Sequence, residues 1–408
     1  MDNKILQFPK NFFWGAATSA YQVEGYSTNT DWWVWDKDNH KTHFRSCDHY
    51  HLYKEDFDLV KKFNQNIHRL SIEWARIEPK EGQWNFEEIE HYRQVLQCLK
   101  NQGIKIMLTL WHFTLPIWLA EKNGWENKQS IFYFKRFAEL IVKELGHLVD
   151  FWITINEPMV YVYQAYLTGI WPPQKKDNAA GRRVLKNLIK SHIEAYKIIH
   201  QSKPDAAVSI AKNNQFFAPF RKNNPFDRIT TRIVAYKWNH YFLKKIKKYL
   251  DFIGLNYYFH FQIKFAFSLK KRTFYEAKTA GKKTSDLGWE IYPQGIYYVL
   301  KELKKYHLPI IITENGLADS QDVKRPKFIV EHLYYVHKAI REGLDVRGYL
   351  HWSLIDNYEW AEGYKPKFGL IAVDFETLRR RPRPSADLYA EICRNNGFSE
   401  NLIKNLKI

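Results

Sequence analysis

The amino-acid sequence predicts an α/β fold, namely a single-domain (β/α)₈ TIM barrel that takes in residues 1–408. Two observations predict it. Eight short apolar runs alternate with amphipathic stretches along most of the chain, and several of these runs are apolar nearly throughout. Alternation of this kind is typical of α/β folds, and continuous apolar runs are typical of parallel strands covered on both faces. A doubly wound open sheet is the alternative that shares the alternation.

The predicted strands are short and rich in branched apolar residues. One of them reads IKIMLTL and another begins PIIIT, so neither shows the apolar–polar alternation of a strand with one wet face. In chain order the predicted strands are Phe12–Gln22, Asn66–Trp74, Ile104–Leu110, Phe151–Asn156, Ala207–Ala211, Asp251–Tyr258, Pro309–Asn315 and Gly348–Ile355.

The stretches between these runs show helical spacing. Within Ser130–Gly146 the apolar residues recur every three or four positions, which places them on one face of a helix, and a second stripe lies in the region 329–340. Gly146 and Gly343 fall near the expected helix ends, where a left-handed cap is favoured. No segment resembles a linker, an internal repeat or a low-complexity region, so we expect one domain. The two stripes are Ile131, Phe134, Ala138, Ile141 and Leu145, and Ile329, Leu333, Val336 and Ile340.

The composition favours a large core and a site that uses aromatic rings. Hydrophobic residues make up 45% of the chain and aromatic residues 17%, with 15 Trp, 26 Tyr and 27 Phe. A chain of this length can bury a sizeable core. Flat rings cover the apolar faces of sugars and bases, although they also serve as ordinary half-buried packing.

The sequence also predicts where the protein works. Met1 to Lys10 lacks the basic stretch and apolar run of a signal peptide, and no stretch approaches the roughly 18 apolar residues that a membrane span needs. The three cysteines are an odd number without metal-like spacing. We therefore expect a cytoplasmic protein with reduced thiols, and no membrane partner, metal or cofactor. The oligomeric state is left open.

The formal net charge of +18 raises the question of a polyanionic partner. Basic runs occur at 244–248, 270–272 and 379–381, but no helix-turn-helix, zinc-finger or RNA-binding pattern accompanies them. Solvated, Lys-rich faces are the favoured interpretation, and no nucleic-acid partner is expected.

Two glutamates follow predicted strands. Glu157 ends the segment TINEP, where Pro158 cannot continue a strand, and Glu314 stands in ITENG, where Asn-Gly indicates a turn. Side chains at the carboxyl ends of barrel strands converge on one face. These are strands four and seven, roughly opposite across that face. Two facing carboxyl groups are what cleavage of a glycosidic bond requires. Either glutamate alone would be better explained by a solvated strand end or a salt bridge.

Four motifs in order make the pattern specific, and together they resemble the family 1 glycoside hydrolases, the β-glucosidase and β-galactosidase family, over essentially the full length. The resemblance implies a TIM barrel and a retaining β-glycosidase that acts on a small-molecule or oligosaccharide β-glycoside such as a glucoside, galactoside or fucoside. The motifs are FWGAATSAYQVEG at 13–25, TINEP at 154–158, ITENG at 312–316 and HWSLIDNYEW at 351–360.

The resemblance also implies roles for individual residues. Glu314 matches the nucleophile and Glu157 the general acid and base, with Arg69 and Tyr258 as partners of the nucleophile and Asn156 at the sugar 2-hydroxyl. A guanidinium and a phenol should keep Glu314 ionised, and that negative charge should raise the pKa of Glu157. The two carboxyl groups are expected about 5–5.5 Å apart, as in retaining enzymes.

The substrate-binding residues are implied in the same way. Four of them, Gln22, His112, Glu359 and Trp360, match ligands of the ring hydroxyls. Trp352 matches a stacking platform, and Trp289 resembles a platform for the leaving group. Taken alone, His112 or Trp352 would more often be a packed core residue. The expected substrate-binding residues are Gln22, His112, Phe113, Asn256, Trp289, Trp352, Glu359, Trp360 and Phe368.

The chain departs from the family pattern in three respects. Phe113 stands where the family usually has Trp, which removes an indole N–H near the sugar 3-hydroxyl. The chain is several dozen residues shorter than is usual, most clearly after Gly25 and between Ala211 and Asp251, so we expect the entrance to the site to be more open and less selective. The high positive charge has no functional account at this stage.

Three rival functions remain open from the sequence. An inactive sugar-binding relative would be expected to lack one of the catalytic carboxylates, and this chain has both. A basic nucleic-acid-binding protein would lack glycosidase activity. A 6-phospho-β-glycosidase would be expected to carry Ser, Lys and Tyr in the places of Glu359, Pro366 and Phe368, because a phosphate needs a cation and hydroxyl donors. Lys365 and Lys367 flank that segment and are the strongest support for this rival.

Overall fold

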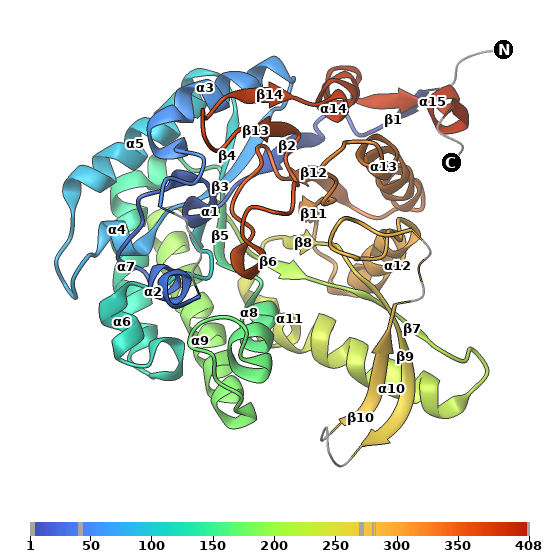
Figure 1. Cartoon of the computed structure of the whole chain (residues 1–408), viewed down its shortest axis with the longest axis horizontal. Helices are drawn as coiled ribbons and strands as arrows, with labels where there is room; N and C mark the ends of the chain where they lie inside the picture. The colour runs from blue at the N-terminus through green and yellow to red at the C-terminus, as the bar shows by residue number, and fades with distance from the viewer. Residues whose placement is uncertain (1–4, 40–43, 269–272, 280, 282, 406–408) are drawn as a thin grey trace.

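The computed structural model describes residues 5–39, 44–268, 273–279, 281 and 283–405. At its centre eight parallel strands form a closed barrel in the order β11-β12-β2-β3-β4-β5-β6-β8 (Figure 1). The fold prediction is therefore confirmed, and the open sheet is excluded. The barrel strands are β2 Phe13–Ala17, β3 Ile67–Ser71, β4 Lys105–Trp111, β5 Phe151–Asn156, β6 Ala207–Asn213, β8 Ile253–Asn256, β11 Ile310–Asn315 and β12 Val346–Trp352.

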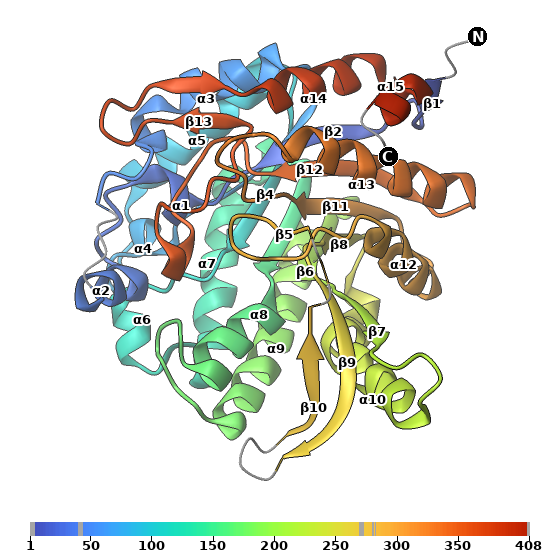
Figure 2. The same ribbon diagram turned by 45° about the vertical axis from the view of Figure 1, so that its right-hand side comes forward.

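Each barrel strand is followed by helices that cover its outer side (Figures 1 and 2). An apolar cluster inside the barrel includes Ile67, Met107, Ile153 and Leu350, and a much larger one fills the space between strands and helices. Apolar contact on both sides explains why the strand sequences lack alternation. The main helices are α3 His49–Lys62, α5 Phe86–Asn101, α7 Ser130–Leu145, α9 Asn178–Ser202, α10 Pro225–Ala235, α11 Tyr241–Ile246, α12 Gln294–Leu303, α13 Arg325–Arg341 and α14 Pro384–Asn395.

Shorter helices lie mostly in the loops at the carboxyl ends of the strands or extend the main helices. Two of them, η3 and η4, are π-helical turns beside the barrel mouth. They are α1 Ala20–Glu24, α2 Asp31–Asp38, α4 Trp74–Ile77, α6 Ile117–Glu121, α8 Pro158–Val162, α15 Glu400–Asn405, η1 Gly124–Glu126, η2 Gly146–Leu148, η3 Tyr163–Thr168, η4 Tyr236–His240, η5 Lys247–Tyr249, η6 Lys304–Tyr306 and η7 Trp360–Glu362.

Three small sheets lie outside the barrel. β1 Ile5–Gln7 pairs with β15 Gly397–Ser399, which joins the two ends of the chain. β13 Ile371–Val373 pairs with β14 Arg380–Pro382. The third sheet has the order β10-β9-β7, and its strands β9 and β10 form a hairpin that projects from the barrel (Figure 2). Its strands are β7 Phe216–Pro219, β9 His260–Ser268 and β10 Thr273–Lys278.

All eight predicted strands exist, but four predicted boundaries extend too far. The strand predicted to reach Tyr258 ends at Asn256. The strand predicted to reach Gln22 ends at Ala17, because residues 20–24 turn into α1 at the barrel rim. The next strand ends at Ser71, and Trp74 begins α4. The last strand ends at Trp352 rather than Ile355. In each case the apolar residues beyond the barrel rim pack beneath loops. The periodicity of apolar residues alone does not distinguish such buried loop residues from a strand.

The helix predictions are largely confirmed, with one error in capping. Phe134, Ala138, Ile141 and Leu145 are buried in α7. Gly343 has a φ of 82° and supplies the left-handed residue after α13. Gly146 does not, because its φ is −60° and the chain continues into the 3-10 turn η2. No helix within the described residues combines the length and apolarity needed to cross a bilayer.

The basic runs have different surroundings. Lys244, Lys245, Lys247 and Lys248 are exposed on α11 and η5. Residues 270–272 lie outside the described residues. Arg380 is bound internally, because its guanidinium pairs with the buried Asp56 at 2.8 Å.

Candidate active site

Glu157 is the first residue after β5, and its conformation is unusual. Its φ of 41° and ψ of 58° place it in the left-handed region, which costs a non-glycine residue free energy and is most often seen at functional positions. Pro158 begins α8 directly after it. The backbone N–H of Glu157 donates to the carbonyl of Ala211 at 2.8 Å. The strained turn therefore directs the carboxyl group into the barrel mouth, where it lines the central cavity.

The hydrogen-bond partners of Glu157 are neutral amides. Its Oε1 accepts from the Nδ2 atoms of Asn256, at 2.8 Å, and Asn213, at 3.1 Å. Burial first, and the negative charge of Glu314 second, raise the pKa of Glu157 to about 7, against the opposing effect of the two amide donors. The sequence argument named only the charge of Glu314, but burial is the larger cause.

Glu314 lies near the end of β11 in a different environment. Arg69 on β3 forms a buried ion pair with its Oε1. The hydroxyl of Tyr258 donates to its Oε2 at 2.9 Å. Burial, and next the charge of Glu314, hold the pKa of Tyr258 well above its ordinary value, so this phenol remains a donor. The carboxyl group of Glu314 is thus bound by a cation and that of Glu157 by amides. Different environments of this kind are what an acid and a nucleophile were expected to need.

Arg69 and two asparagines form a scaffold between the carboxyl groups. The Nη2 of Arg69 donates to Oδ1 of Asn156 at 2.8 Å, which leaves the Nδ2 of Asn156 3.0 Å from Nε2 of His112. Asn256 is fixed by the hydroxyl of Thr313, which donates to its Oδ1 at 2.7 Å. Burial, and next the charge of Arg69, lower the pKa of His112 well below its ordinary value, so its imidazole is neutral.

Gln22 and Glu359 lie on the opposite wall. The Nε2 of Gln22 donates to the carbonyl of Tyr358 at 2.7 Å and lies 3.4 Å from Oε2 of Glu359. Burial, and next the charge of Glu314, raise the pKa of Glu359 to about 8. A carboxyl group and a carboxamide side by side accept from and donate to neighbouring hydroxyls, as sugar recognition requires.

Aromatic rings complete the wall. The ring of His112 lies nearly parallel to Trp352 and Trp360, with centroids 6.1 and 6.0 Å away. Phe113 packs edge-on against Trp360 at 5.3 Å. On the outer side, Trp289 lies 6.0 Å from Tyr258 and 5.8 Å from Phe368.

The cavity enclosed by these residues has a volume of about 360 Å³. Nearly all of the residues named from the sequence line it. Arg69 and Asn256 stand behind the wall and hold Glu314 and Glu157. The named residues that line the cavity are Gln22, His112, Phe113, Asn156, Glu157, Tyr258, Trp289, Glu314, Trp352, Glu359, Trp360 and Phe368.

The structure adds lining residues that the sequence argument missed. Asn213 ends β6 and binds Glu157, so its position after a barrel strand was the signal that could have found it. The others come from the helices and loops around the mouth, where no sequence pattern marked them. They are Val160, Tyr163, Gln164, Ile170, Trp171, Gln215, Trp238, Phe259, Phe261, Ala361 and Glu362.

Lys212 is a further charged group behind the cavity wall. It is fully buried on β6, and its Nζ donates to the carbonyl of Asn213. It also lies 5.7 Å from the ring centroid of Trp238. Burial lowers the pKa of Lys212 to about 7, and the charge of Glu157 opposes that shift.

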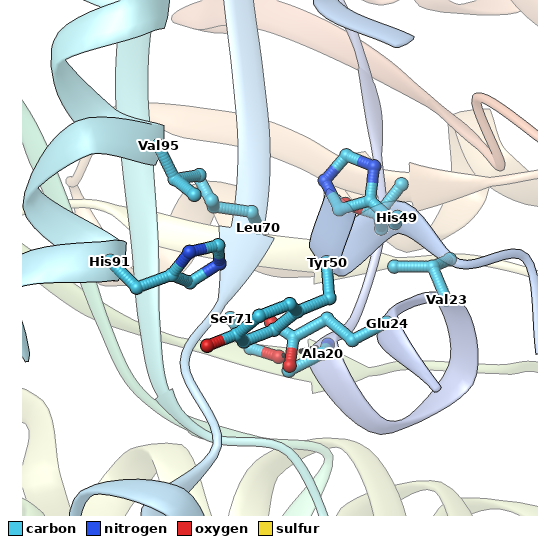
Figure 3. Close-up of a pocket in the computed structure, with 10 residues that line it drawn as sticks. Ala20, Val23, Glu24, His49, Tyr50, Leu70, Ser71, His91 and Val95 are labelled. Carbon is cyan, nitrogen blue, oxygen red and sulfur yellow. Dashed lines mark hydrogen bonds between the residues drawn. The ribbon is translucent and has the colours of Figure 1, made fainter. Parts of the chain in front are cut away.

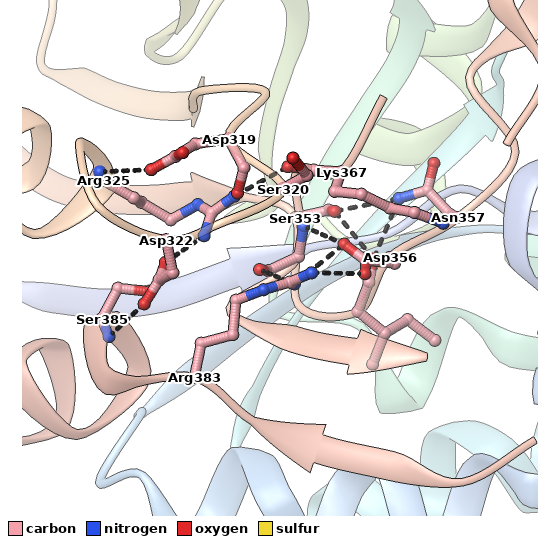
Figure 4. Close-up of polar contacts among 12 residues, drawn as sticks. Asp319, Ser320, Asp322, Arg325, Ser353, Asp356, Asn357, Lys367, Arg383 and Ser385 are labelled. Carbon is pink, nitrogen blue, oxygen red and sulfur yellow. Dashed lines mark hydrogen bonds and ion pairs between the residues drawn. The ribbon is translucent and has the colours of Figure 1, made fainter. Parts of the chain in front are cut away.

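A buried polar network holds the loops that follow β11 and β12 (Figure 4). The guanidinium of Arg383 binds both carboxylate oxygens of Asp356, at 3.0 and 2.8 Å. Arg325 pairs with Asp322 and also donates to the backbone carbonyl of Lys367 at 2.7 Å. The segment from Trp352 to Phe368, which carries six lining residues, is therefore anchored to α13 and α14.

A second cavity lies between α1, α3, α5 and β3, away from the carboxyl pair (Figure 3). His49, Tyr50 and His91 are among the residues that line it. Its volume is about 10 Å³, roughly the space of one water molecule, so it cannot hold a sugar.

The fold is a closed (β/α)₈ barrel, and two carboxyl groups lie at one mouth among hydroxyl-binding and aromatic side chains. This combination defines the class of protein as a glycoside hydrolase. The chain belongs to glycosyl hydrolase family 1, whose model matches residues 5–244 and 239–398. It is accordingly a β-glycosidase that hydrolyses O-glycosyl compounds.

Named relatives agree with this assignment. The chain is 33% identical to beta-glucosidase A of Acetivibrio thermocellus, over 96% of this chain and 99% of the relative. It is 33% identical to a beta-galactosidase of Sulfolobus acidocaldarius, over 98% and 97% of the two chains. Its structure matches that of a beta-glycosidase from Pyrococcus horikoshii with a TM-score of 0.95, 36% identity and 99% coverage of both chains.

Proposed function

We propose that the enzyme hydrolyses β-glucosides and related β-galactosides and β-fucosides with retention of configuration, with Glu314 as nucleophile and Glu157 as acid and base. The observation that carries the assignment is the difference between the two carboxyl groups. Glu314 is bound by Arg69 and Tyr258, which stabilise a carboxylate. Glu157 is buried among amides, and its pKa is raised to about 7, which suits a proton donor.

In the first step the Glu314 carboxylate attacks the anomeric carbon while the Glu157 proton moves to the departing glycosidic oxygen. The bond to the aglycone breaks and a glycosyl ester of Glu314 forms. Esterification removes the negative charge of Glu314, which had helped to raise the pKa of Glu157. Glu157 then ionises more readily and can serve as base.

In the second step the Glu157 carboxylate takes a proton from water, whose oxygen attacks the anomeric carbon and releases Glu314. Two inversions restore the β configuration. Asn156, held by Arg69, supports the reaction as the partner of the sugar 2-hydroxyl. The carboxyl separation characteristic of retaining enzymes stays a prediction.

An unphosphorylated glycone is supported by Glu359, which lines the cavity. Its carboxyl group, whose pKa is raised to about 8, repels a phosphate when ionised and supplies no cation to bind one when protonated. Lys367 places its Nζ 4.2 Å from the ring centroid of Phe375, outside the cavity lining, and Lys365 is exposed. The two lysines that supported the phosphosugar rival therefore do not line the cavity.

Two further expectations belong to this proposal. The pairing of β1 with β15 supports treating residues 1–408 as one domain. The free thiols of Cys47, Cys98 and Cys393 support a reducing, cytoplasmic location.

The deciding experiment compares kcat/KM for nitrophenyl β-glucoside, β-galactoside and β-fucoside with that for nitrophenyl β-glucoside 6-phosphate. We expect hydrolysis of the neutral glycosides and at least about a tenfold preference for glucoside over its phosphate, because Glu359 opposes a dianion. A preference of similar size for the phosphate would contradict the proposal.

A further inference from the structure

Helix α10, Pro225–Ala235, is turned with its apolar face toward solvent. Phe226, Ile229 and Ile233 recur at helical spacing, and their exposed fractions are 60%, 54% and 39%. The face that packs on the protein instead carries Asp227, Thr230 and Thr231 together with Val234, all buried. A surface helix of a globular protein has the opposite arrangement, with apolar residues inward.

The apolar surface continues onto neighbouring elements. Tyr236 follows at the start of η4 and is 43% exposed. The rings of Phe226 and Phe265 stack with centroids 5.5 Å apart, which joins α10 to β9. Phe267, farther along the hairpin, is 71% exposed. We call this surface the α10 face, and it comprises Phe220, Phe226, Ile229, Ile233, Tyr236, Phe265 and Phe267.

Basic side chains surround the α10 face. Residues 216–249 contain nine lysines and arginines and a single acid, Asp227. That acid is buried and bound by Arg221 at 2.8 Å, so it does not offset the charge of the surface. Several ammonium groups lie over exposed rings, among them Lys278, 4.9 Å from the ring centroid of Phe220, and Lys244, 4.8 Å from that of Tyr236.

Exposed apolar side chains that adjoin one another and are surrounded by basic groups are typical of a surface that binds a partner or a membrane. A short amphipathic helix with Phe and Ile on one side and Lys and Arg around them has the composition of a helix that lies in a lipid–water interface. We propose that the α10 face docks the enzyme on an anionic membrane surface, with the apolar stripe at the level of the acyl boundary and the basic rim among the headgroups.

The positive charge around the α10 face favours an anionic membrane over a second copy of the chain as its partner. A two-fold interface built on the α10 face would bring two strongly basic rims together without acidic partners. An anionic lipid surface instead supplies the countercharge. The expectation of no membrane partner rested on the lack of a membrane-spanning segment in the sequence. Docking at the interface does not require such a segment.

The docking surface adjoins the mouth of the active site. Trp238, two residues after Tyr236, lines the cavity and lies 5.8 Å from Tyr163. Tyr163 and Ile170 also line the mouth and are largely exposed. Docking would therefore hold the mouth close to the membrane surface.

The test is sedimentation with vesicles of phosphatidylcholine that contain about one-third phosphatidylglycerol. The full-length enzyme should sediment with these vesicles, bind pure phosphatidylcholine at least about tenfold more weakly, and be released by about 0.5 M NaCl. The triple variant Phe226→Ser, Ile229→Ser and Ile233→Ser should lose at least about tenfold in partitioning, and so should Arg228→Gln with Arg232→Gln.

A matched control replaces exposed apolar residues elsewhere, Phe132→Ser and Val323→Ser, and should partition like the wild type. All variants should keep the wild-type kcat/KM on nitrophenyl β-glucoside, which shows that they are folded. Equal partitioning of the wild type and the triple variant would overturn the proposal. So would light scattering that shows a wild-type dimer lost in the triple variant, combined with no vesicle binding, because a second copy would then cover the α10 face.

Discussion

At the scale of single residues, the proposed division of catalytic roles between two glutamates rests on their neighbours. Arg69 and Tyr258 stabilise the carboxylate of Glu314, whereas Glu157 has only neutral donors within the cavity. The sequence motifs were sufficient to name both glutamates and their partners. They were not sufficient to find Asn213 or to rank burial as the main cause of the raised pKa of Glu157, because both depend on packing.

The acid role predicts a pH dependence. The pKa of Glu157 is about 7, so kcat/KM should fall as pH rises through about 7, because the acid loses the proton that it must donate. Asn213→Ala removes a donor that favours the ionised carboxylate, so the pKa should rise and the basic limb should move to higher pH. The measurement is kcat/KM against pH, with Asn101→Ala as a surface-amide control. A limb that stays in place or moves down would exclude this role for Asn213.

The same role predicts a dependence on the leaving group. Glu157→Ala should lose about 10²–10⁴-fold in kcat/KM on alkyl glucosides, and much less on dinitrophenyl glucoside, whose aglycone departs without protonation. Azide should restore turnover by attacking the glycosyl ester without a base, giving a β-glucosyl azide detectable by mass spectrometry. Equal losses on all substrates without azide rescue would indicate a different acid.

At the scale of elements, strand ends and the loops after them build the site. The eight strands were predictable from continuous apolar runs. The sheet β10-β9-β7 was not predicted, although Phe261, Ile263, Phe265 and Phe267 in β9 stand at alternate positions, as in a strand with one exposed face. The inverted helix α10 was not predictable, because it has an ordinary amphipathic pattern whose orientation only tertiary packing decides. The loop after β11 lies directly against Trp352 at Gly316, because a side chain at that position would meet the backbone carbonyl of Trp352.

The loop after β12 depends on the ion pair between Arg383 and Asp356, whose side chains are 10% and 1% exposed. Arg383→Met should lower the free energy of unfolding by about 3–5 kcal/mol, because it leaves a buried carboxylate unpaired. It should also raise KM, since the loop carries Glu359 and Trp360. Urea denaturation and steady-state kinetics measure the two effects.

Two variants separate the ion pair from general disruption. Arg383→Met combined with Asp356→Leu should be more stable than the single variant, because no charge is then left unpaired. Arg347→Met removes the exposed pair with Asp345 and should cost about 0–1 kcal/mol. A loss for Arg383→Met as small as that for Arg347→Met would show that the network does not hold the loop.

At the scale of the whole molecule, barrel closure brings together residues that are distant in sequence. Arg69 on β3 reaches Glu314 on β11, and Gln22 reaches the segment after β12. Alternation of strands and helices fits both a barrel and an open sheet, so closure had to come from the family resemblance or the structure. The net charge was interpreted from the sequence as solvated, Lys-rich faces without a function, and part of it surrounds the α10 face.

The central claim is that Glu314 forms a covalent glycosyl intermediate. Incubation with 2,4-dinitrophenyl 2-deoxy-2-fluoro-β-glucoside should inactivate the enzyme. The fluorine slows both formation and hydrolysis of the glycosyl ester, whereas the good dinitrophenolate leaving group speeds only its formation, so the ester accumulates. Mass spectrometry of the digested protein should locate one fluoroglucosyl group on the peptide that contains Glu314. Labelling of Glu157 or of another residue, or inactivation without covalent label, would contradict the account.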